Sequence, residues 1–396
     1  MGVISIPSSW SRKKLFEFAE VKGGNGFPLR YQSRDSQISF FKVSDLGKIG
    51  DSKYLDSSNY SISNENLAIL KARVFQKDTI IFAKIGAAVF LERKRILKID
   101  ACIDNNLAGI ILTNNDVDIE FLHYLLENYR ISNHMTATAL PSINTQDLLK
   151  AEFNLPLIDE QKEIAGVLRD IDALINNLKR EILKRRNFRI AITQEKLTNH
   201  GGKMVRLGNH SNFYKGSGLA KSDLAESGDY PAIHYGELFL KYPETISETI
   251  SSTNKILPSS FLSRSNDVLM PSSDVTATGL SVASCITIDD VILGGDVLVV
   301  RPDKNLINGS YLSYIIRNSR EQILRLVNGT TVFHIYGKDL ANFEFRLPDI
   351  DEQNEVVFLL DSLRNEIDSL EKELHKYECI KQGMKHDLLT GKVRLL

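Results

Sequence analysis

The sequence contains few of the residues and motifs that mark catalytic or disulfide-bonded proteins. Its 396 residues include only three cysteines, Cys102, Cys285 and Cys379, and no Cys-x-x-Cys spacing. This usage argues against both a zinc site and a disulfide framework. The chain has no GxxxxGK[ST] loop, no GxSxG elbow and no HExxH pair, and its eight histidines are scattered. We therefore predict neither a metal site nor catalysis by this chain.

Long apolar runs and an excess of one charge are also missing. No uninterrupted apolar run approaches the roughly 18 residues of a membrane-spanning helix, and no charged-then-apolar leader opens the chain. We expect a soluble, cytoplasmic protein. The 49 basic and 50 acidic residues give a net charge of −1, which is no global signal for a polyanion partner. Any nucleic-acid binding must therefore be local.

The most informative feature that is present is a tandem repeat with an offset of 192 residues. Residues 153–168 read FNLPLIDEQKEIAGVL, and residues 345–360 read FRLPDIDEQNEVVFLL. The same offset aligns FFKVSDL (40–46) with AIHYGEL (232–238). A period this long indicates that each copy is a domain-sized unit with its own core.

Each LPxxDEQ segment opens a long heptad pattern. Apolar residues follow at alternating steps of four and three, which forms a seam that needs a partner helix. Asp159 and Asp351 are expected to cap the two helices, and glycines to end them. A helix of roughly 40 residues is about 60 Å long, and we expect the two helices to pack antiparallel. The seam residues are Ile164, Leu168, Ile171, Ile175, Leu178, Ile182, Val356, Leu360, Leu363, Ile367, Leu370 and Leu374.

The rest of each copy is predicted to be a globule of mixed α and β structure. Strands are expected at 80–85, 87–91 and 107–112, and at 267–271, 281–286 and 296–302. An amphipathic helix is expected at 118–128, with a counterpart at 309–318. The segments between the strands differ in sequence, so the frame is shared and the loops are not.

These patterns predict an α+β fold with two globular mixed α/β domains in a pseudo-twofold arrangement. Two long antiparallel coiled-coil helices would separate the domains. The predicted boundaries are a first globule at 1–158, a first spacer helix at 159–200, a second globule at 201–350 and a C-terminal spacer helix at 351–396.

Two short patterns resemble parts of enzymes. Asp159, Glu160 and Lys162 resemble the acidic and lysine core of a Mg²⁺-dependent nuclease. The second copy has Asn354 in place of the lysine, and the two carboxylates are adjacent at a helix start, so helix capping explains them better. The GGNG segment at 23–26 is better explained as a turn, because no GxGxxG spacing follows a strand.

The duplicated LPxxDEQ turn with its heptad helix resembles the DNA-specificity subunit of type I restriction-modification systems, over nearly the full length. Further similar segments are DTIIFAKIG (78–86), TATALPSIN (136–144) with its counterpart GTTVFHIYG (329–337), and the ending HDLLTGKVRLL (386–396). The resemblance implies two target-recognition domains on an antiparallel helical spacer and no catalysis by this chain. It also implies assembly on double-stranded DNA with two methylation subunits and, for cleavage, restriction subunits. S-adenosylmethionine, ATP and Mg²⁺ would bind to those partners.

A subunit of this kind would read a bipartite target whose half-sites are split by a non-specific spacer. Each domain would read a few base pairs in a major groove, where every base pair has its own donor and acceptor pattern. Half-sites on one face of DNA recur about every 34 Å, so a helix of about 60 Å suits domains one to two turns apart. Because the loops differ between the copies, the two half-sites should differ in sequence.

Candidate DNA contacts are polar and basic residues of the loops between strands. Lysine and arginine would bind phosphates or guanine edges, and asparagine, serine and threonine would distinguish bases. Each is open to the alternative that it is a solvated loop residue. The candidates are Lys84, Arg93, Lys94, Arg95, Asn105, Asn106, Thr138, Ser142 and Asn144 in the first globule, and Lys215, Lys221, Ser272, Ser273, Asp274, Thr276, Thr278, Thr331, His334, Tyr336 and Lys338 in the second.

Three alternatives stay open at this point. The basic cluster of Arg180, Lys184, Arg185, Arg186 and Arg189 could contact spacer phosphates or a methylation subunit, or be a solvated helix face. A coiled-coil scaffold with two protein-binding heads and no DNA role explains the helices and the near-zero charge equally well. It explains less well why the loops vary within a constant frame. An autonomous DNA-modifying enzyme would need a cofactor motif, and the chain lacks the N/D-P-P-Y/F motif of adenine methyltransferases.

Overall fold

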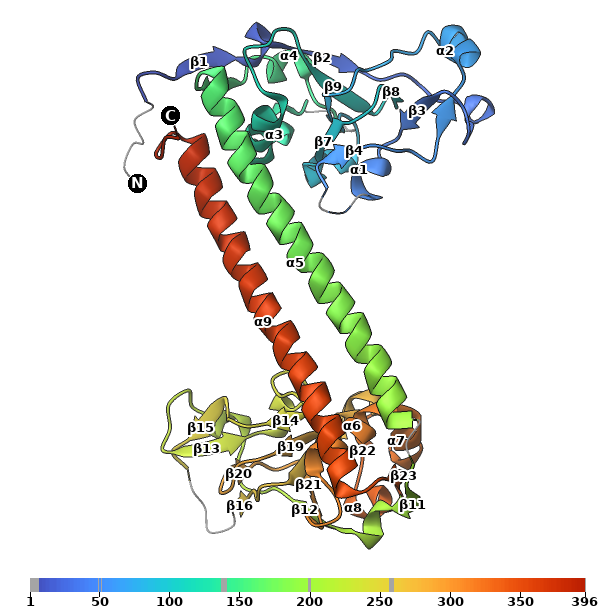
Figure 1. Ribbon diagram of the computed structural model, residues 1–396, viewed down its shortest axis with the longest axis vertical. Helices are drawn as coiled ribbons and strands as arrows, with labels where there is room; N and C mark the ends of the chain where they lie inside the picture. The colour runs from blue at the N-terminus through green and yellow to red at the C-terminus, as the bar shows by residue number, and fades with distance from the viewer. Residues whose placement is uncertain are drawn as a thin grey trace. The chain divides into compact units, whose positions relative to one another are not determined.

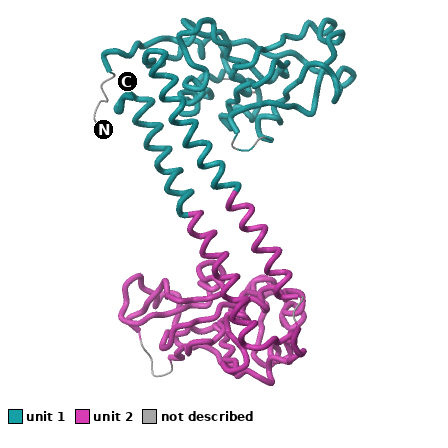
Figure 2. Tube along the Cα trace, viewed as in Figure 1, with its two compact units in different colours: residues 1–180, 372–396 teal, residues 181–371 magenta. Residues whose placement is uncertain are grey.

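The computed structural model describes residues 7–48, 50, 52–136, 141–198, 201–255 and 260–395. The chain divides into two compact units, one of residues 1–180 with 372–396 and the other of residues 181–371 (Figure 2). Each unit contains one globule and one segment of each long helix, α5 (Ile158–Thr198) and α9 (Ile350–Leu389) (Figure 1). Both units are therefore built from both copies of the repeat.

The first globule, called the first head, is closed at its base by β1 (Ser11–Lys14) paired antiparallel with β10 (Glu152–Leu155). Its main sheet has the order β2-β9-β6-β7-β4, and a smaller sheet has the order β5-β3-β8. The strands are β2 (Ala19–Gly23), β3 (Ile38–Phe41), β4 (Tyr54–Leu55), β5 (Ser61–Ile62), β6 (Ile80–Ala83), β7 (Lys94–Leu97), β8 (Ala101–Ile103) and β9 (Leu107–Leu112). The helices are α1 (Asp45–Lys48), α2 (Asn64–Leu70), α3 (Ile119–Asn128) and α4 (Thr145–Leu148).

The second globule, called the second head, repeats this topology. β11 (Lys203–Arg206) pairs with β23 (Glu344–Leu347), the main sheet has the order β12-β21-β17-β19-β14, and the smaller sheet has the order β15-β13-β20-β16. The strands are β12 (Ser211–Lys215), β13 (Tyr230–Ile233), β14 (Thr245–Ile246), β15 (Ser251–Thr253), β16 (Phe261–Leu262), β17 (Asp267–Pro271), β18 (Ser273–Asp274), β19 (Ser284–Ile286), β20 (Ile292–Leu293), β21 (Val297–Pro302) and β22 (Phe333–His334). The helices are α6 (Gly309–Asn318), α7 (Arg320–Leu326) and α8 (Gly337–Leu340). The predicted α+β class is confirmed.

Two of the expected strands are wrong. Residues 87–91 form a 3-10 helix, and of residues 281–286 only Ser284–Ile286 are a strand, because Ala277–Ser281 form a 3-10 helix. At 87–91 the apolar side chains that indicated a strand divide between the core and the surface. Val89 is buried whereas Phe90 is 56% exposed, and Leu280 is buried. A one-turn helix produces the same short apolar pattern as a strand, so periodicity cannot separate them.

Within each unit the segments of α5 and α9 run antiparallel. In the first unit Asp172 pairs with Lys381 at 2.5 Å, and Lys179 further along α5 pairs with Glu378, which precedes Lys381 on α9. Among the predicted seam residues, Leu178, Leu370 and Leu374 are half-buried and the others are buried. In the first unit the end of α9 also joins the core of the first head through Leu388 and Leu389.

The glutamine of each LPxxDEQ segment binds its helix to the head. Gln161 is buried, and its amide donates to the carbonyl oxygens of Asp116 (3.0 Å) and Pro156 (2.9 Å) while its Oε1 accepts from the Asp118 backbone N–H (2.9 Å). Gln353 makes the same three bonds in the second unit, from its amide to the carbonyls of Leu306 and Pro348 and from the Asn308 backbone N–H to its Oε1. Because the N-cap residue of α3 or α6 is one partner, this amide fixes the head's helix against the long helix.

Replacing this glutamine should destabilise the unit in which it lies. Gln161→Ala removes the partner of three backbone groups, of which the Pro156 carbonyl lies in a buried bond, and this costs about 2 to 4 kcal/mol in the free energy of unfolding. Glu163→Ala is the matched control, because Glu163 is exposed on the same helical turn. Urea unfolding of both variants measures the difference. Equal unfolding midpoints would show that the amide bonds do not secure the head.

The start of each long helix differs from the prediction. Both helices begin one residue before the expected cap, so Asp159 and Asp351 lie in the first turn. In α9 the cap is Asp349, whose Oδ1 accepts from the Glu352 backbone N–H at 2.9 Å. In the second copy the LPxxDEQ segment contains two aspartates near the turn, Asp349 and Asp351, and the sequence spacing does not show which of them caps the helix.

Glu160 also lies in an unexpected environment. Its side chain is 3% exposed and binds the Arg394 guanidinium, with 2.7 Å between Arg394 Nη2 and Oε2, and it accepts from Trp10 Nε1 at 3.3 Å. Asp159 and Lys162 point to the exposed side of the helix. The acidic pair is therefore not assembled as a metal-binding core, and Glu160 instead links the start of α5 to both end segments of the chain.

Candidate nucleic-acid interface

Five of the predicted contact residues of the second head line one pocket of about 460 Å³. Three chain segments form it: the end of β12, the end of β17 with the turn that follows it, and the segment from β22 into α8. The Ser272 backbone N–H donates to the Asp296 carbonyl (2.8 Å), and the Ile335 N–H donates to the Ser272 carbonyl (3.0 Å). These bonds join the turn after β17 to the start of β21 and to the segment after β22, and the Gly216 N–H, which donates to the Val297 carbonyl (2.8 Å), ties the end of β12 to the start of β21. The predicted residues that line the pocket are Lys215, Ser272, His334, Tyr336 and Lys338.

This pocket combines aromatic rings with positive charge. The His334 and Tyr336 rings are stacked at 15° with centroids 6.0 Å apart, and Lys338 Nζ lies 5.8 Å from the Tyr336 centroid. At the rim Lys215 Nζ pairs with Asp296 Oδ1 at 2.8 Å, and a hydrogen bond from that ammonium group holds the pKa of Asp296 below its usual range. Tyr336 is 48% exposed. Rings and cations on an accessible surface suit the flat, anionic surface of a nucleic acid.

The corresponding place in the first head also gathers predicted contact residues. The Lys84 N–H donates to the Asn106 carbonyl (2.7 Å), and the Ile143 N–H donates to the Lys84 carbonyl (2.9 Å), which repeats the bonding of the second pocket. A Cβ atom on Gly23 of β2 would lie 2.9 Å from Lys84 Nζ, so the lysine packs across that strand end. The side chains here are those of Lys84, Asn106, Ser142 and Asn144. This site carries amide, hydroxyl and ammonium groups where the second head carries rings.

Other candidates of the first head lie elsewhere. Lys94 is 3% exposed, and its Nζ bonds to Glu92 Oε2 (2.6 Å) and the Tyr129 carbonyl (2.9 Å), so it cannot contact DNA in this conformation. Arg95 is half-buried, donates to the Gly50 carbonyl (3.2 Å) and faces the helices. Arg93 and Asn105 are exposed, and Thr138 lies outside the described residues. The basic run of residues 93–95, which suggested a DNA contact, thus lies at the start of β7, and part of it is directed inward.

The remaining candidates of the second head surround the pocket or lie on separate turns. Asp274 accepts from the Val275 N–H and from the Thr276 hydroxyl, both at 2.7 Å, and so shapes its own loop. Thr278 and Thr331 are exposed, and Lys221 lies on a separate exposed 3-10 turn. Ser273 is half-buried in β18.

Three residues at the two sites were missed by sequence reasoning. Asp296 orients Lys215, Tyr214 lines the pocket beside it, and Gly23 makes room for Lys84. Asp296 occupies the place of Asn106, because its bond to Ser272 matches the bond between Asn106 and Lys84. Its equivalence to the candidate Asn106 was the signal that the repeat contained.

The basic cluster of α5 is used mainly between helices. Arg185 pairs with Glu366 (3.1 Å), Arg186 with Glu371 (2.6 Å) and Arg189 with Glu244 (2.8 Å), whereas Lys184 is exposed. Arg180 bonds to Asn177 on the same helix. Arg180, Lys184 and Arg186 are nevertheless exposed, as a solvated face would be, and a contact with spacer phosphates or a methylation subunit stays a prediction.

The described part of the chain contains no group of three or more His, Cys, Asp or Glu side chains placed to hold a metal ion. Cys102 and Cys285 are buried, which raises the pKa of their thiols to about 11 and about 12 and keeps them protonated. Among the described helices, none has the length and apolar content needed to span a membrane.

The two heads have main sheets of the same topology, present different surfaces at the same place, and pack on segments of the same two long helices. These features define a two-site recognition protein. Matching frames indicate duplication of a binding module, and differing surfaces indicate two different ligands.

The comparison with known proteins agrees with that class. The family model described as "Type I restriction modification DNA specificity domain" matches residues 7–185 and again residues 200–378, so the chain belongs to this family. The MjaVIII type I restriction enzyme specificity subunit of Methanocaldococcus jannaschii is 20% identical, and the alignment covers all of this chain and 95% of the relative. This chain is a specificity subunit with two domains for a bipartite DNA target, and such subunits are non-catalytic.

Two solved structures share the fold. The type I restriction-modification S subunit from M. genitalium has a TM-score of 0.61 at 14% identity, and the match covers 98% of this chain and 99% of that one. A chain from a structure on complex assembly and conformational transition of the type I R-M system has a TM-score of 0.51 at 16% identity, and the match covers 98% and 100% of the two chains. At such identities the likeness concerns the fold alone.

Proposed function

We propose that this chain reads an asymmetric bipartite DNA sequence, one half with each head, through the two corresponding sites. The observation that carries the proposal is their shared position: in both heads the same three segments meet, held by the same backbone bonds, but present different side chains. A common frame would present each half-site in the same way, and the side chains would select different bases. The predicted domain boundaries belong to this proposal, with residues 1–158 and 201–350 as the two target-recognition domains.

The chemistry of each site favours a different form of recognition. In the first head, Lys84 is suited to guanine or phosphate. The Asn106 oxygen and the Asn144 NH2 group remain for base edges, because Asn106 Nδ2 donates to Asp104 Oδ1 (2.8 Å) and Asn144 Oδ1 accepts from the backbone as the N-cap of α4. In the second head, Tyr336 and His334 offer rings for apolar contact with thymine methyl groups or sugars, and Lys338 a phosphate contact. The second head is also the more acidic, with 13 basic and 16 acidic residues at 204–350 against 19 and 17 at 1–158. Phosphate attraction should therefore contribute less to its binding.

The partner subunits are inferred from the catalytic and cofactor motifs that this sequence lacks. We infer that the chain assembles with two methylation subunits, which would carry S-adenosylmethionine, and with restriction subunits that would use ATP and Mg²⁺ for cleavage. A net charge of −1 supports this division, because the partners can add phosphate contacts to the few that this chain offers. Such an assembly would work in the cytoplasm, where the DNA of its host is found.

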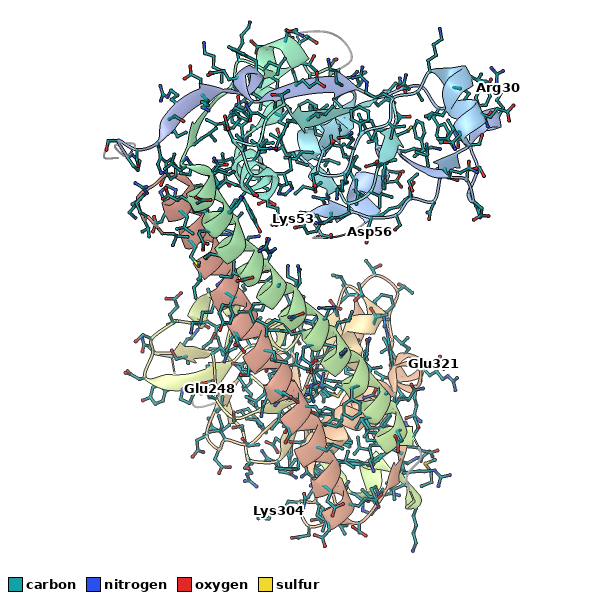
Figure 3. All side chains as sticks on the ribbon, turned by 45° about the horizontal axis from the view of Figure 1, so that its top comes forward. Arg30, Lys53, Asp56, Glu248, Lys304 and Glu321 are labelled. Carbon is teal, nitrogen blue, oxygen red and sulfur yellow. The ribbon has the colours of Figure 1, made fainter. Side chains whose placement is uncertain are left out.

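The test separates phosphate contacts from base contacts in the second head. Lys338→Ala should weaken binding of the assembled complex to target duplex and lower the slope of log affinity against log salt by about one. Tyr336→Ala should weaken target binding by about 1 to 3 kcal/mol and leave that slope unchanged. Fluorescence anisotropy at several salt concentrations measures both. Lys304→Ala is the matched control, because Lys304 is exposed on a turn outside the pocket (Figure 3).

Two results would contradict the proposal. One is binding to the target that is insensitive to salt and to both site variants, which would favour a scaffold without a DNA role. The other is an equal loss with Lys304→Ala, which would show that the effect is not specific to the pocket.

A further inference from the structure

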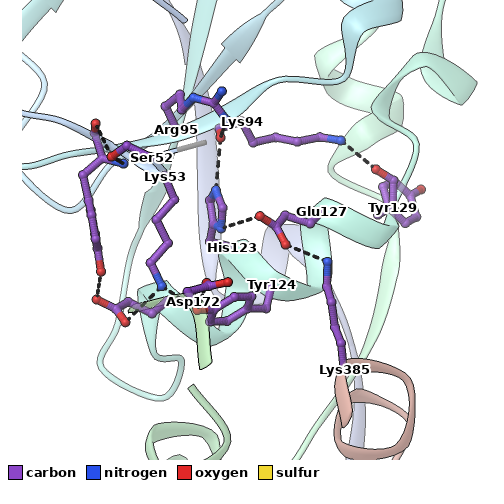
Figure 4. Close-up of polar contacts among 12 residues, drawn as sticks. Ser52, Lys53, Lys94, Arg95, His123, Tyr124, Glu127, Tyr129, Asp172 and Lys385 are labelled. Atoms are coloured by element: carbon purple, nitrogen blue, oxygen red, sulfur yellow. Dashed lines mark hydrogen bonds and ion pairs between the residues drawn. The ribbon is translucent and has the colours of Figure 1, made fainter. Parts of the chain in front are cut away.

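A cluster of polar side chains joins the first head to both long helices (Figure 4). Lys53, whose side chain is 9% exposed, donates to Tyr124 Oη at 2.8 Å and to Glu120 Oε2 at 3.4 Å. Tyr124 in turn donates to Asp172 Oδ2 of α5 at 2.6 Å. On α9, Lys381 pairs with Asp172 at 2.5 Å and Lys385 with Glu127 at 2.6 Å. We call this cluster the first latch: Lys53, Glu120, Tyr124, Glu127, Asp172, Lys381 and Lys385.

The second head is joined to its helix segments by a cluster at the corresponding place. Glu244 pairs with Arg189 of α5 at 2.8 Å and with Arg364 of α9 at 3.4 Å. Tyr314 donates to Asp361 Oδ1 of α9 at 2.6 Å. Burial alone would raise the pKa of Glu244, but Arg189 and Arg317 outweigh it and hold the pKa below its usual range. We call this cluster the second latch: Glu244, Tyr314, Arg317, Arg189, Asp361 and Arg364.

Sheet register shows that the two latches are equivalent. β4 and β14 are the last strands of the matching sheets, and each runs parallel to its neighbour, β7 or β19. Lys53 immediately precedes β4, and Glu244 immediately precedes β14. The tyrosines occupy the same position in α3 and α6, where each is the sixth residue of its helix. On the long helices, Asp172 and Arg364 occupy equivalent positions, because they are separated from each other by the repeat offset of 192 residues.

Most charges of the equivalent positions are reversed, although Lys381 and Arg189, which are also 192 residues apart, keep the same sign. On the heads a lysine in the first latch corresponds to a glutamate in the second, and Glu127 corresponds to Arg317 at the same position of its helix. On the long helices Asp172 corresponds to Arg364. Tyr124 and Tyr314 keep both their type and their bond to an aspartate. The two copies therefore kept the position of the contact and exchanged its polarity.

We propose that these latches are positioning contacts that hold each head at a fixed angle on its own helix segments, and that their opposite polarity makes the two heads non-interchangeable. In the other place, the first head would bring Lys53 against Arg364, which stands where Asp172 stands in the first latch. The second head would bring Glu244 against Asp172. Like charges confined in a poorly solvated contact repel each other strongly. This inference concerns contacts inside the chain, so it does not depend on DNA binding.

The first experiment reverses one latch and then completes the reversal in the full-length chain. Lys53→Glu should lower the melting midpoint of the first unit by roughly 5 to 15 °C, because it places a carboxylate among Glu120 and Asp172. Adding Glu120→Ser and Asp172→Arg gives these positions the residues of the second copy, and at least half of the loss should be recovered. Lys77→Glu applies the same charge change at an exposed position of the same head and should have little effect.

The second experiment exchanges a head and remains informative if the point variant does not fold. A chain whose residues 203–347 are replaced by residues 11–155 carries the first head twice, cut at the paired strands β1·β10 and β11·β23. A matched chimera changes Lys53 to Glu and Glu120 to Ser in the grafted copy only. Hydrogen exchange of the long helices should be at least tenfold faster around Arg189 and Arg364 in the unmatched chimera than in the matched one. Equal exchange in the two chimeras, or no recovery in the triple variant, would overturn the proposal.

Discussion

Replacing residues 203–347 with the equivalent head of a relative should change one half of the methylated DNA sequence and leave the other half as it was. The cut points lie on β11 and β23, where Lys203 faces Leu347, so the graft carries the whole second pocket and none of the first. The effect is large because correct and incorrect bases at one contact differ by about 1 to 3 kcal/mol, and several contacts change together. Mapping methylated adenines in cells that supply the partner subunits gives the result.

The reciprocal graft of residues 11–155 is the matched control for this exchange. It should change only the opposite half of the methylated sequence. A donor head with an acidic residue at the position of Glu244 should be chosen for the second place, so that a mismatched latch does not obscure the outcome. A change in both halves after either exchange would reject independent reading by the two heads.

Inserting one heptad in α5 after Arg180 and one in α9 after Glu371 should lengthen the spacer of the recognised sequence and leave both halves unchanged. Seven residues add about 10 Å to a helix, which corresponds to at most about three base pairs. A whole heptad preserves the apolar seam, so residues such as Ile175 and Ile367 keep their buried positions. The methylated sequences of the variant complex should show a spacer longer by one to three base pairs.

A heptad in α5 alone is the control for the paired insertion. It leaves α9 seven residues too short and shifts ion pairs such as Arg185 with Glu366 out of register, so methylation should be lost. If the paired insertion yields active complexes with the original spacer, the helices do not set the distance between the half-sites.

Much of the architecture was predictable because repetition and periodicity are local signals. The strands at 107–112 and 267–271 and the helix at 309–318 have the bounds that the sequence indicated. The heptad pattern placed both long helices, and the repeat showed that the copies share a frame. The 3-10 turn at 87–91 was mistaken for a strand because short apolar segments fit both structures.

The sites were less predictable because they depend on contacts between distant segments. Nothing near Lys94 in the sequence indicates that it is buried against the Tyr129 carbonyl, 35 residues away. Asp296 and Lys215 are similarly far apart in the chain, and the pairing of β12 with β21 brings them together. The link from Lys53 through Tyr124 to Asp172 of α5 could not be inferred either, since the repeat conserves the place of this contact and reverses the charges of Lys53 and Asp172.

The closure of the first unit by the end of the chain has a consequence for synthesis on the ribosome. Leu388 and Leu389 belong to the core of that unit, and Arg394 neutralises the buried carboxylate of Glu160. A growing chain therefore makes the first head early but cannot complete its core until the last turns of α9 have been synthesised. Apolar surface on the first head and on the start of α5 therefore stays uncovered while the second head is synthesised. Chaperones have this surface as a substrate for most of that time. A nonsense mutation before the codon of Leu388 would accordingly damage the half of the protein that was made first.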